Sequence, residues 1–189
     1  NLTIIDEILK NIPDFTMERL RAIPLNDKNT FTMLQKADTL GVFQLESEGI
    51  RRVLLNLKPE RFDDIVAVLA LYRPGPMENI DEFIARRHGK PFTYEHPVLE
   101  PILKSTYGII VYQEQIMQIA QSFANFTLGQ ADLLRRAISK KDEAQLKAQE
   151  TAFLNGAMNR GHSLETAKQI YRYFLKFNNY GFNKSHAVA

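Results

Sequence analysis

Residues 127–141 read TLGQADLLRRAISKK, and this stretch indicates the fold. Thr127 and Gln130 have the spacing of a capping box, in which two side chains bond free backbone N–H groups at the start of a helix. At about 100° per residue, one face of that helix collects the apolar side chains of Leu134, Ala137 and Ile138. The stretch therefore predicts a helix packed on a core, and the same signals recur along the chain.

Helices are also expected on both sides of this stretch. Upstream, a β-branched, extended entry at 108–112 leads into a helix over 113–123, whose apolar residues face inward. Downstream, one helix is expected over 142–159 and another from a cap at Ser163 to about residue 178.

The N-terminal half carries similar signals, separated by proline and glycine. Proline marks helix boundaries because it fixes φ and lacks an N–H donor. Helices are expected over 3–11, 16–22, 47–57 and 60–71, from Asp27 or Asn29 to Lys36, from Asn79 or Asp81 to about Gly89, and in the short segment 98–104. These patterns predict a mainly α fold with extended Pro/Gly-punctuated linkers and little or no sheet.

Bulk composition narrows the class of protein. The 189 residues are 44% hydrophobic, enough for a sizeable core. Lysine and arginine number 24 against 22 acidic residues, so a nucleic-acid role must be argued from charge clusters rather than from the net +2. The absence of cysteine suits a cytoplasmic location. No apolar run approaches the roughly 20 residues of a membrane span, and we expect both ends to be cuts through a longer protein.

The helix at 132–141 also has a basic face. The arc opposite its apolar stripe carries Arg135, Arg136, Ser139 and Lys140. Arginine forks and lysine charges suit a triphosphate or a sugar-phosphate backbone, because both spread negative charge over several oxygens. From these residues alone, a solvated helix face is the more common explanation.

Two other segments offer ligand-binding groups. Residues 180–186 are expected to form a loop with backbone N–H groups and the side chains of Tyr180, Phe182, Asn183, Lys184, Ser185 and His186. This set suits a base with its phosphates, or else a plain helix C-terminal turn with exposed polar residues. Arg73 precedes a stiff Pro-Gly-Pro turn that would fix its orientation, although a helix stop alone explains that motif.

Other polar groups give weaker indications. Gln113 and Gln115 either project toward a partner or serve as helix-start residues, and the second explanation is favoured. His88, His96 and His162 have no acidic partner at metal-ligand spacing, so neither a zinc site nor a hydrolase site is expected.

Five strings of the sequence together resemble one known family. They are GVFQLES (41–47), LYRPGPM (71–77), YGIIVYQEQ (107–115), ADLLRRA (131–137) and YGFNKSHA (180–187). The strings and their order are similar to those of the C-family, DnaE-type α subunits of bacterial DNA polymerase III. The resemblance covers essentially the whole chain and identifies it with the fingers region of that family.

The resemblance implies a DNA-directed DNA polymerase that works in DNA replication. In the family, three palm aspartates hold the two Mg²⁺ ions of phosphoryl transfer, and they would precede residue 1. Without those ions nothing lowers the pKa of the 3′-hydroxyl, so this chain alone is expected to be inactive and to hold no catalytic residue or metal site. The implied partners are template-primer DNA, dNTPs, the remaining polymerase domains and replisome subunits, with the sliding clamp contacted elsewhere and no membrane.

The resemblance also implies roles for individual residues. Arg135 and Arg136 match arginines that contact the triphosphate of the incoming nucleotide. Further phosphate-binding candidates are Lys140, Lys184, Ser185, His186 and Arg73, and DNA-contacting candidates are Lys141, Gln113, Gln115, Tyr180 and Asn183. Tyr180 or Phe182 would form part of the surface against which the nascent base pair packs. Residues 1–76 would be palm-proximal helices, 77–106 a helix with a Pro-rich linker, and 107–189 nucleotide-facing helices with a terminal loop.

Two other classes of protein stay open on the residues alone. A stand-alone helical nucleic-acid-binding module would bind DNA by itself, with a steep dependence on salt. A helical protein-interaction scaffold would have an exposed apolar groove and no response to nucleotides. The abrupt ends of the chain disfavour both.

Overall fold

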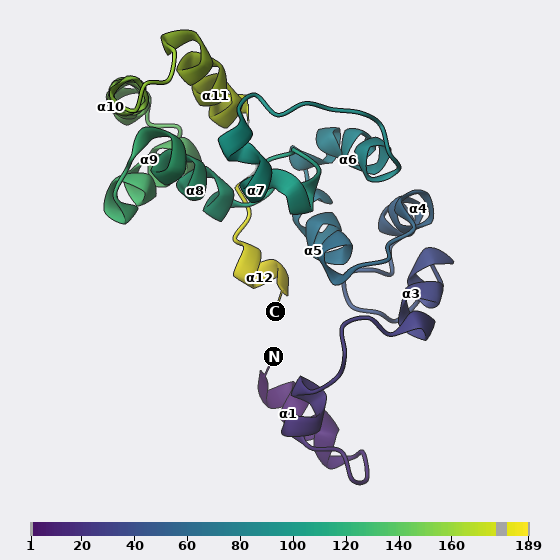
Figure 1. Ribbon diagram of the computed structural model, residues 1–189. Helices are drawn as coiled ribbons and strands as arrows, with labels where there is room; N and C mark the ends of the chain where they lie inside the picture. Colours follow the sequence, from purple (N-terminus) through teal and green to yellow (C-terminus); the bar gives the residue numbers. More distant parts are fainter. Residues whose placement is uncertain (1, 177–180, 189) are drawn as a thin grey trace.

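The computed structural model describes residues 2–176 and 181–188, and this part of the chain folds almost entirely into helices (Figure 1). It contains no strand, and its one isolated β-bridge pairs Tyr112 with Phe182 in parallel. The prediction of a mainly α fold with little or no sheet is confirmed. Tyr180 and the expected end of the last long helix at residue 178 lie outside the described residues.

The helices follow the expected order. The first half forms α1 (Leu2–Lys10), α2 (Met17–Arg21), α3 (Lys28–Gln35), α4 (Glu48–Leu57), α5 (Phe62–Leu71), the 3₁₀ turn η1 (Pro76–Asn79) and α6 (Ile80–Arg87). The central region forms η2 (Pro97–Leu99), α7 (Glu100–Leu103) and η3 (Lys104–Thr106). The second half forms α8 (Gln113–Ala124), α9 (Leu128–Lys140), α10 (Glu143–Asn159), α11 (Leu164–Lys176) and α12 (Lys184–Val188).

Side-chain caps begin several helices where the sequence predicts them. In the capping box of α9, the Gln130 N–H donates to Thr127 Oγ1 (3.3 Å) and the Thr127 N–H donates to Gln130 Oε1 (2.8 Å). Asp27, rather than Asn29, caps α3 by accepting a backbone N–H at 2.7 Å. Such a cap contributes about 1 kcal/mol because it satisfies an otherwise unpaired donor. Ser163 is the cap that the sequence predicts before α11, and Asp142, where a helix is expected to begin, caps α10.

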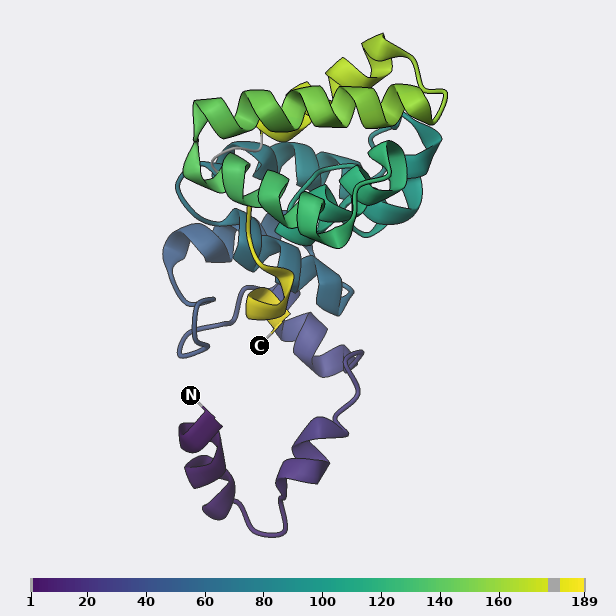
Figure 2. The ribbon, with the colours of Figure 1, turned by 90° about the vertical axis from the view of Figure 1, so that its left-hand side faces the viewer.

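One apolar core lies among α7, α8, α9, α10 and α11. Figure 2 shows α10 running across α8 and α9, and it contacts both of them as well as α11. The centre of this core is a group of aromatic rings from Phe123, Phe153, Tyr171 and Phe174. Leu134 and Ile138 of α9 point into it, as the apolar stripe predicts.

A second core lies among α3, α4, α5 and α6. Its buried side chains include Leu54 of α4 and Leu71 of α5, and Ala187 of α12 packs against the same core. Helix α6, the helix expected in the segment 77–106, adds Ile80 and Phe83 to this core.

The extended stretch before α8, residues 109–111, packs against both cores. Ile110 packs in the core of α7–α11, whereas its neighbours Ile109 and Val111 pack in the core of α3–α6. Successive side chains of an extended backbone point to opposite sides, so a β-branched run buried on both sides suits this position. The stretch fixes where α8 begins relative to both cores.

Helices α1 and α2 lie away from both cores in Figures 1 and 2. We call residues 2–25, which contain these two helices, the α1–α2 arm. Leu9 is buried, but several large apolar side chains of the arm are exposed, namely Ile4, Ile8, Ile12, Ile23 and Leu25.

The C-terminal segment, residues 181–188, differs from the loop that the sequence predicts. Residues 184–188 form the short helix α12, so the prediction of a loop through His186 is wrong. Asn183 acts as its cap, since its Oδ1 accepts the His186 N–H at 3.1 Å and its backbone oxygen accepts the Ala187 N–H at 3.3 Å. The burial of Ala187 against the second core holds this helix in place. Among the described residues, none of the helices is both long enough and apolar enough to cross a membrane.

Candidate nucleotide-binding surface

The start of α8 joins α9 to the C-terminal segment. The Gln113 backbone N–H donates to the carbonyl oxygen of Phe182 (2.9 Å), and its side-chain Nε2 donates to that of Gly181 (2.7 Å). Its Oε1 accepts from Arg135 Nη1 on α9 (3.1 Å). A Cβ at Gly181 would lie 2.7 Å from Gln113 Cγ, so glycine permits this close approach.

Glu114 and Asp63 hold the first turn of α12. Both carboxylate oxygens of Glu114 accept the backbone N–H of Lys184 at 3.1 Å. The Lys184 ammonium lies 3.5 Å from Asp63 Oδ1 on α5 and 5.4 Å from the centre of the Tyr112 ring. Lys184 is therefore placed between α5 and the start of α8, with its side chain partly exposed.

Arg135 and Arg136 share one counter-ion, Asp132, one turn earlier on α9. Arg135 Nε lies 2.8 Å from Asp132 Oδ1, and Arg136 Nε lies 2.8 Å from Asp132 Oδ2. The hydrogen bond from Arg135, together with the charges of both arginines, holds the pKa of Asp132 below its usual value, so it stays ionised. The Arg135 side chain is 25% exposed and that of Arg136 61%, so both reach the surface.

Arg73 lies against the ring of Phe182. Its guanidinium carbon is 3.8 Å from the ring centre, and the His186 ring meets the Phe182 ring edge to face at 5.5 Å. Burial lowers the pKa of Arg73, and its Nε has no hydrogen-bond partner among the described residues. Arg73 and His186 thus lie on one aromatic side chain, from segments more than a hundred positions apart.

Asn183, Ser185 and His186, the remaining candidates of the C-terminal segment, take part in the cap of α12. Asn183 Oδ1 accepts the Ser185 hydroxyl as well as the His186 N–H. Asn183, Ser185 and His186 are exposed, so the short helix presents them to solvent.

Gln115 differs from the other candidates because it is buried. Its Oε1 accepts the N–H groups of Val111 (2.8 Å) and Tyr112 (2.9 Å), and its Nε2 donates to Thr106 Oγ1 (2.9 Å). Both ends of the amide are engaged inside the protein. The side chain therefore orients the extended stretch before α8 and does not reach the surface.

Lys140 and Lys141 lie at the C-terminal end of α9. Both are exposed, and within residues 2–176 and 181–188 neither ammonium forms an ion pair or a hydrogen bond. They extend the basic face beyond Arg136 to the C-terminal end of the helix.

The structure thus divides the predicted residues into groups. Gln113, Arg135 and the C-terminal segment with Lys184 are linked by hydrogen bonds at the start of α8, and Arg73 joins them through Phe182. Arg136, Lys140 and Lys141 follow along α9, Gln115 is internal, and Tyr180 lies outside the described residues.

Sequence reasoning missed Asp132 and Glu114. The spacing of Asp132 three and four positions before the arginines was a usable signal, whereas the Glu114 contact spans 70 positions and left none.

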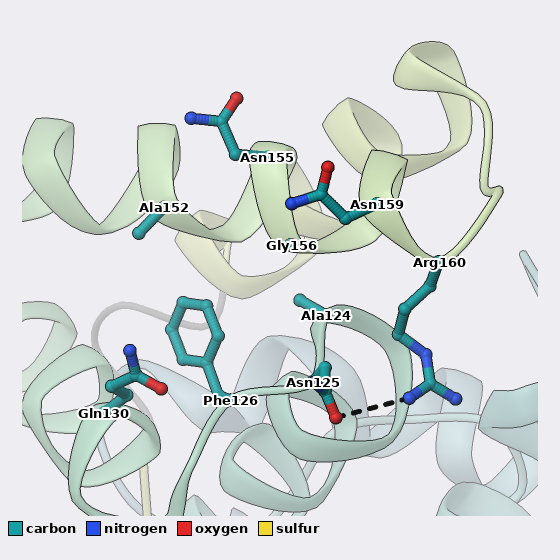
Figure 3. A pocket seen from close by; sticks show the side chains of 9 residues that line it. All are labelled: Ala124, Asn125, Phe126, Gln130, Ala152, Asn155, Gly156, Asn159 and Arg160. Atoms are coloured by element: carbon teal, nitrogen blue, oxygen red, sulfur yellow. Dashed lines mark hydrogen bonds between the residues drawn. The ribbon is translucent and has the colours of Figure 1, made fainter.

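A cavity of about 350 Å³ lies elsewhere, between the α8–α9 corner and α10 (Figure 3). Four amide side chains line it, from Asn125, Gln130, Asn155 and Asn159. Arg160, at its edge, reaches Asn125 Oδ1 at 3.4 Å. None of the predicted phosphate-binding residues lines this cavity, so it is not the site that the sequence indicates.

Two of the histidines, His96 and His162, lie among aromatic rings. His96 and His162 meet edge to face with ring centres 4.7 Å apart, and His162 stacks on Phe123. Burial, followed by the charges of His96 and Arg160, lowers the pKa of His162. Within the described residues, no group of three or more His, Asp or Glu side chains is placed to hold a metal ion.

Comparison with known proteins agrees with the resemblance in the five strings. A family model described as the bacterial DNA polymerase III alpha subunit finger domain matches residues 1–161. The DNA polymerase III subunit alpha of Halalkalibacterium halodurans is 58% identical over the whole chain, and those of Staphylococcus aureus strains COL and MRSA252 are 53% and 52% identical. The chain spans 17% of the length of the first relative and 18% of the others. The chain therefore belongs to the finger-domain family of bacterial DNA polymerase III alpha subunits.

Proposed function

We propose that this chain is the nucleotide-facing fingers domain of a replicative DNA-directed DNA polymerase, and that it binds the triphosphate of the incoming dNTP. The observation that carries the proposal is the arginine pair on α9, whose side chains both reach the surface, with Arg135 hydrogen-bonded to Gln113 at the start of α8. Family membership supports the same role.

The contribution of this surface is electrostatic positioning. Arg135 and Arg136 bind the β- and γ-phosphates and orient the α-phosphorus for in-line attack. Lys140, Lys184, Ser185, His186 and Arg73 add charge and donors around the same triphosphate. Without a nucleotide, Asp132 is the counter-ion of both arginines. A triphosphate carries more negative charge than one carboxylate, so it can bind the N–H groups that Asp132 leaves free.

Mg²⁺ is the cofactor of the whole polymerase in this proposal and is bound outside this chain. Near the arginines, the carboxylates of Asp132, Glu114 and Asp63 are each engaged by a cation or a backbone N–H. These residues do not fit a dedicated Mg²⁺ site, whose ligands are free carboxylate oxygens and water. The chain itself binds and orients phosphate.

Template-primer DNA is the second proposed ligand. Lys141, Asn183 and Gln113 are its candidate contacts among the described residues, with Tyr180 as a further one, whereas Gln115 is too buried for direct contact. The remaining polymerase domains and replisome subunits are further partners, the sliding clamp is contacted elsewhere, and the working location is the cytoplasm.

A dNTP titration of the 189-residue chain, at low and at moderate salt, tests the proposal. We expect weak, salt-sensitive binding that the Arg135→Ala/Arg136→Ala double variant abolishes. Arg52→Ala is the matched control, because it removes an exposed arginine that pairs with Glu48 four positions away on α4, and it should bind like the wild type. Triphosphate binding that survives the double substitution would contradict the proposal, and DNA binding without any response to dNTP would favour a plain nucleic-acid-binding module.

A further inference from the structure

We infer that Gln113 is a positioning residue that couples Arg135 to the C-terminal segment, so that the two act as one phosphate-binding unit. The inference rests on the proposed function, because it assigns Gln113 a task within the same surface. It replaces direct DNA contact as the principal role of this side chain.

The first step is the hydrogen-bond inventory of Arg135. A guanidinium has five N–H donors. Nε and Nη2 lie 2.8 and 2.7 Å from Asp132 Oδ1, and Nη1 lies 3.1 Å from Gln113 Oε1. Each terminal nitrogen keeps one further N–H, and these two donors are left for phosphate oxygens. Asp132 and Gln113 therefore fix the direction in which the free end of Arg135 points.

The second step is the orientation of the Gln113 amide. Its oxygen faces an arginine donor, and its nitrogen faces the Gly181 carbonyl oxygen at 2.7 Å. In the reverse orientation, the Gln113 NH₂ group would face the Arg135 donor and the Gln113 oxygen would face the Gly181 carbonyl oxygen. Both neighbours therefore select the same orientation of the amide. The backbone bond from Gln113 to Phe182 (2.9 Å) and the close approach of Gly181 hold the segment at this spacing.

The third step is what the segment carries. Phe182 lies on Arg73, and Lys184 follows two positions later with its backbone N–H on Glu114. A displacement of the segment therefore moves Lys184, takes the Phe182 ring away from Arg73 and removes the partner of the Gln113 nitrogen. By linkage, phosphate binding at Arg135 and docking of the segment strengthen each other through Gln113.

Steady-state incorporation of one dNTP on a primed template, by a full-length α subunit that contains this chain, tests the inference. Gln113→Met keeps the length of the side chain but removes both bonds, and Gln113→Glu keeps an acceptor for Arg135 but loses the donor to Gly181. Gly181→Ala keeps every polar group but displaces the Gln113 side chain. Each should lower kcat/KM for the dNTP about tenfold, mainly through KM, because a positioning bond to a charged group is lost. Gln118→Met, at an exposed position on the same helix, is the control and should leave kcat/KM unchanged.

A double-mutant comparison separates coupling from a general structural role. If Gln113 acts through Arg135, Gln113→Met should cost little once Arg135→Ala is present. A full, additive loss in that background would overturn the inference, as would wild-type kcat/KM in Gln113→Met and Gly181→Ala. If Arg135→Ala itself leaves the KM for dNTP unchanged, the proposed function fails; if it raises KM but the Gln113 variants do not, only the coupling fails.

Discussion

The Asp64 carboxylate is fully buried at the start of α5, where it ties α5 to α6. It accepts the backbone N–H of Glu60 at 3.1 Å and lies within ion-pair distance of Arg61 and Arg87. The hydroxyl of Tyr107 donates to it at 3.1 Å, and burial together with the Asp64 charge raises the pKa of Tyr107 to about 12, so that donor stays protonated. This network is structural and does not touch the proposed phosphate surface.

Asp64 should make the stability of the chain depend on pH. Burial opposes its ionisation, but the Glu60 N–H and the two arginines prevail and hold its pKa below the ordinary 3.8. Because the folded pKa is depressed, this stabilisation is present above the ordinary pKa and is lost as pH falls through the lower, folded value. Chemical unfolding of the wild type and of Asp64→Asn, at several values from about pH 7 down to about pH 2, checks this.

The expected free energies of unfolding differ in two ways. At neutral pH, Asp64→Asn should be less stable by about 2 to 4 kcal/mol, since it leaves buried donors and Arg87 without a carboxylate. Toward acid pH the two curves should converge, because only the wild type loses an ionised Asp64. Parallel curves would show that Asp64 does not carry this pH dependence.

Individual residues of the site were predictable where local periodicity decides their position. The apolar stripe of α9 turns Arg135 and Arg136 outward, and both reach the surface. Gln115 is offered above both as a helix-start residue and as a DNA-contacting candidate. Its burial was not predictable, because its partners come from the preceding turn and from extended backbone that periodicity does not describe. The task of Gln113 depends on a bond across 68 positions, which no local pattern reveals.

At the scale of elements, α10 packs on the end of α8 through a glycine. A Cβ at Gly156 would lie 2.2 Å from the backbone oxygen of Ala124, a distance that no side chain rotation can relieve. The helices can approach this closely because position 156 has no side chain.

Gly156→Ala should therefore destabilise the chain although alanine favours helix. We expect a loss of about 1 to 3 kcal/mol, because α10 must shift away from α8. Gly129→Ala is the matched control, since it is also a helical glycine and its Cβ would meet nothing within 4 Å. It should be neutral or stabilising by up to about 1 kcal/mol. Urea unfolding midpoints measure both changes, and equal effects of the two substitutions would refute the close-packing argument.

Long elements were predicted better than short ones. Helices α8, α9 and α10 are 12, 13 and 17 residues long, and their predicted bounds agree closely with the structure. The prediction missed α12 because five residues are too few for a periodic pattern, and its stability comes from Asn183 and from the burial of Ala187. Tertiary packing, rather than local propensity, decides such a helix.

At the scale of the whole molecule, stability should reside in the two cores and not in the α1–α2 arm. Ile8 of the arm is 53% exposed, whereas Leu54 of α4 is completely buried. Removing an exposed side chain changes little, but truncating a buried leucine loses its transfer free energy and leaves a cavity.

Ile8→Ala should therefore change the free energy of unfolding of the chain by less than about 0.5 kcal/mol. Leu54→Ala should lower it by about 2 to 5 kcal/mol. Chemical denaturation of the two variants side by side provides the comparison. A loss at Ile8 as large as that at Leu54 would mean that the arm packs on the cores in solution.

The central claim, that the arginine pair on α9 binds the triphosphate of the incoming nucleotide, is tested most directly by single-nucleotide incorporation kinetics of a full-length α subunit that carries Arg135→Ala and Arg136→Ala. The account predicts a fall in kcat/KM for the dNTP of at least about a hundredfold, because two charge-assisted contacts are lost, with template-primer affinity much less affected. An unchanged kcat/KM for the dNTP in a folded double variant would contradict it.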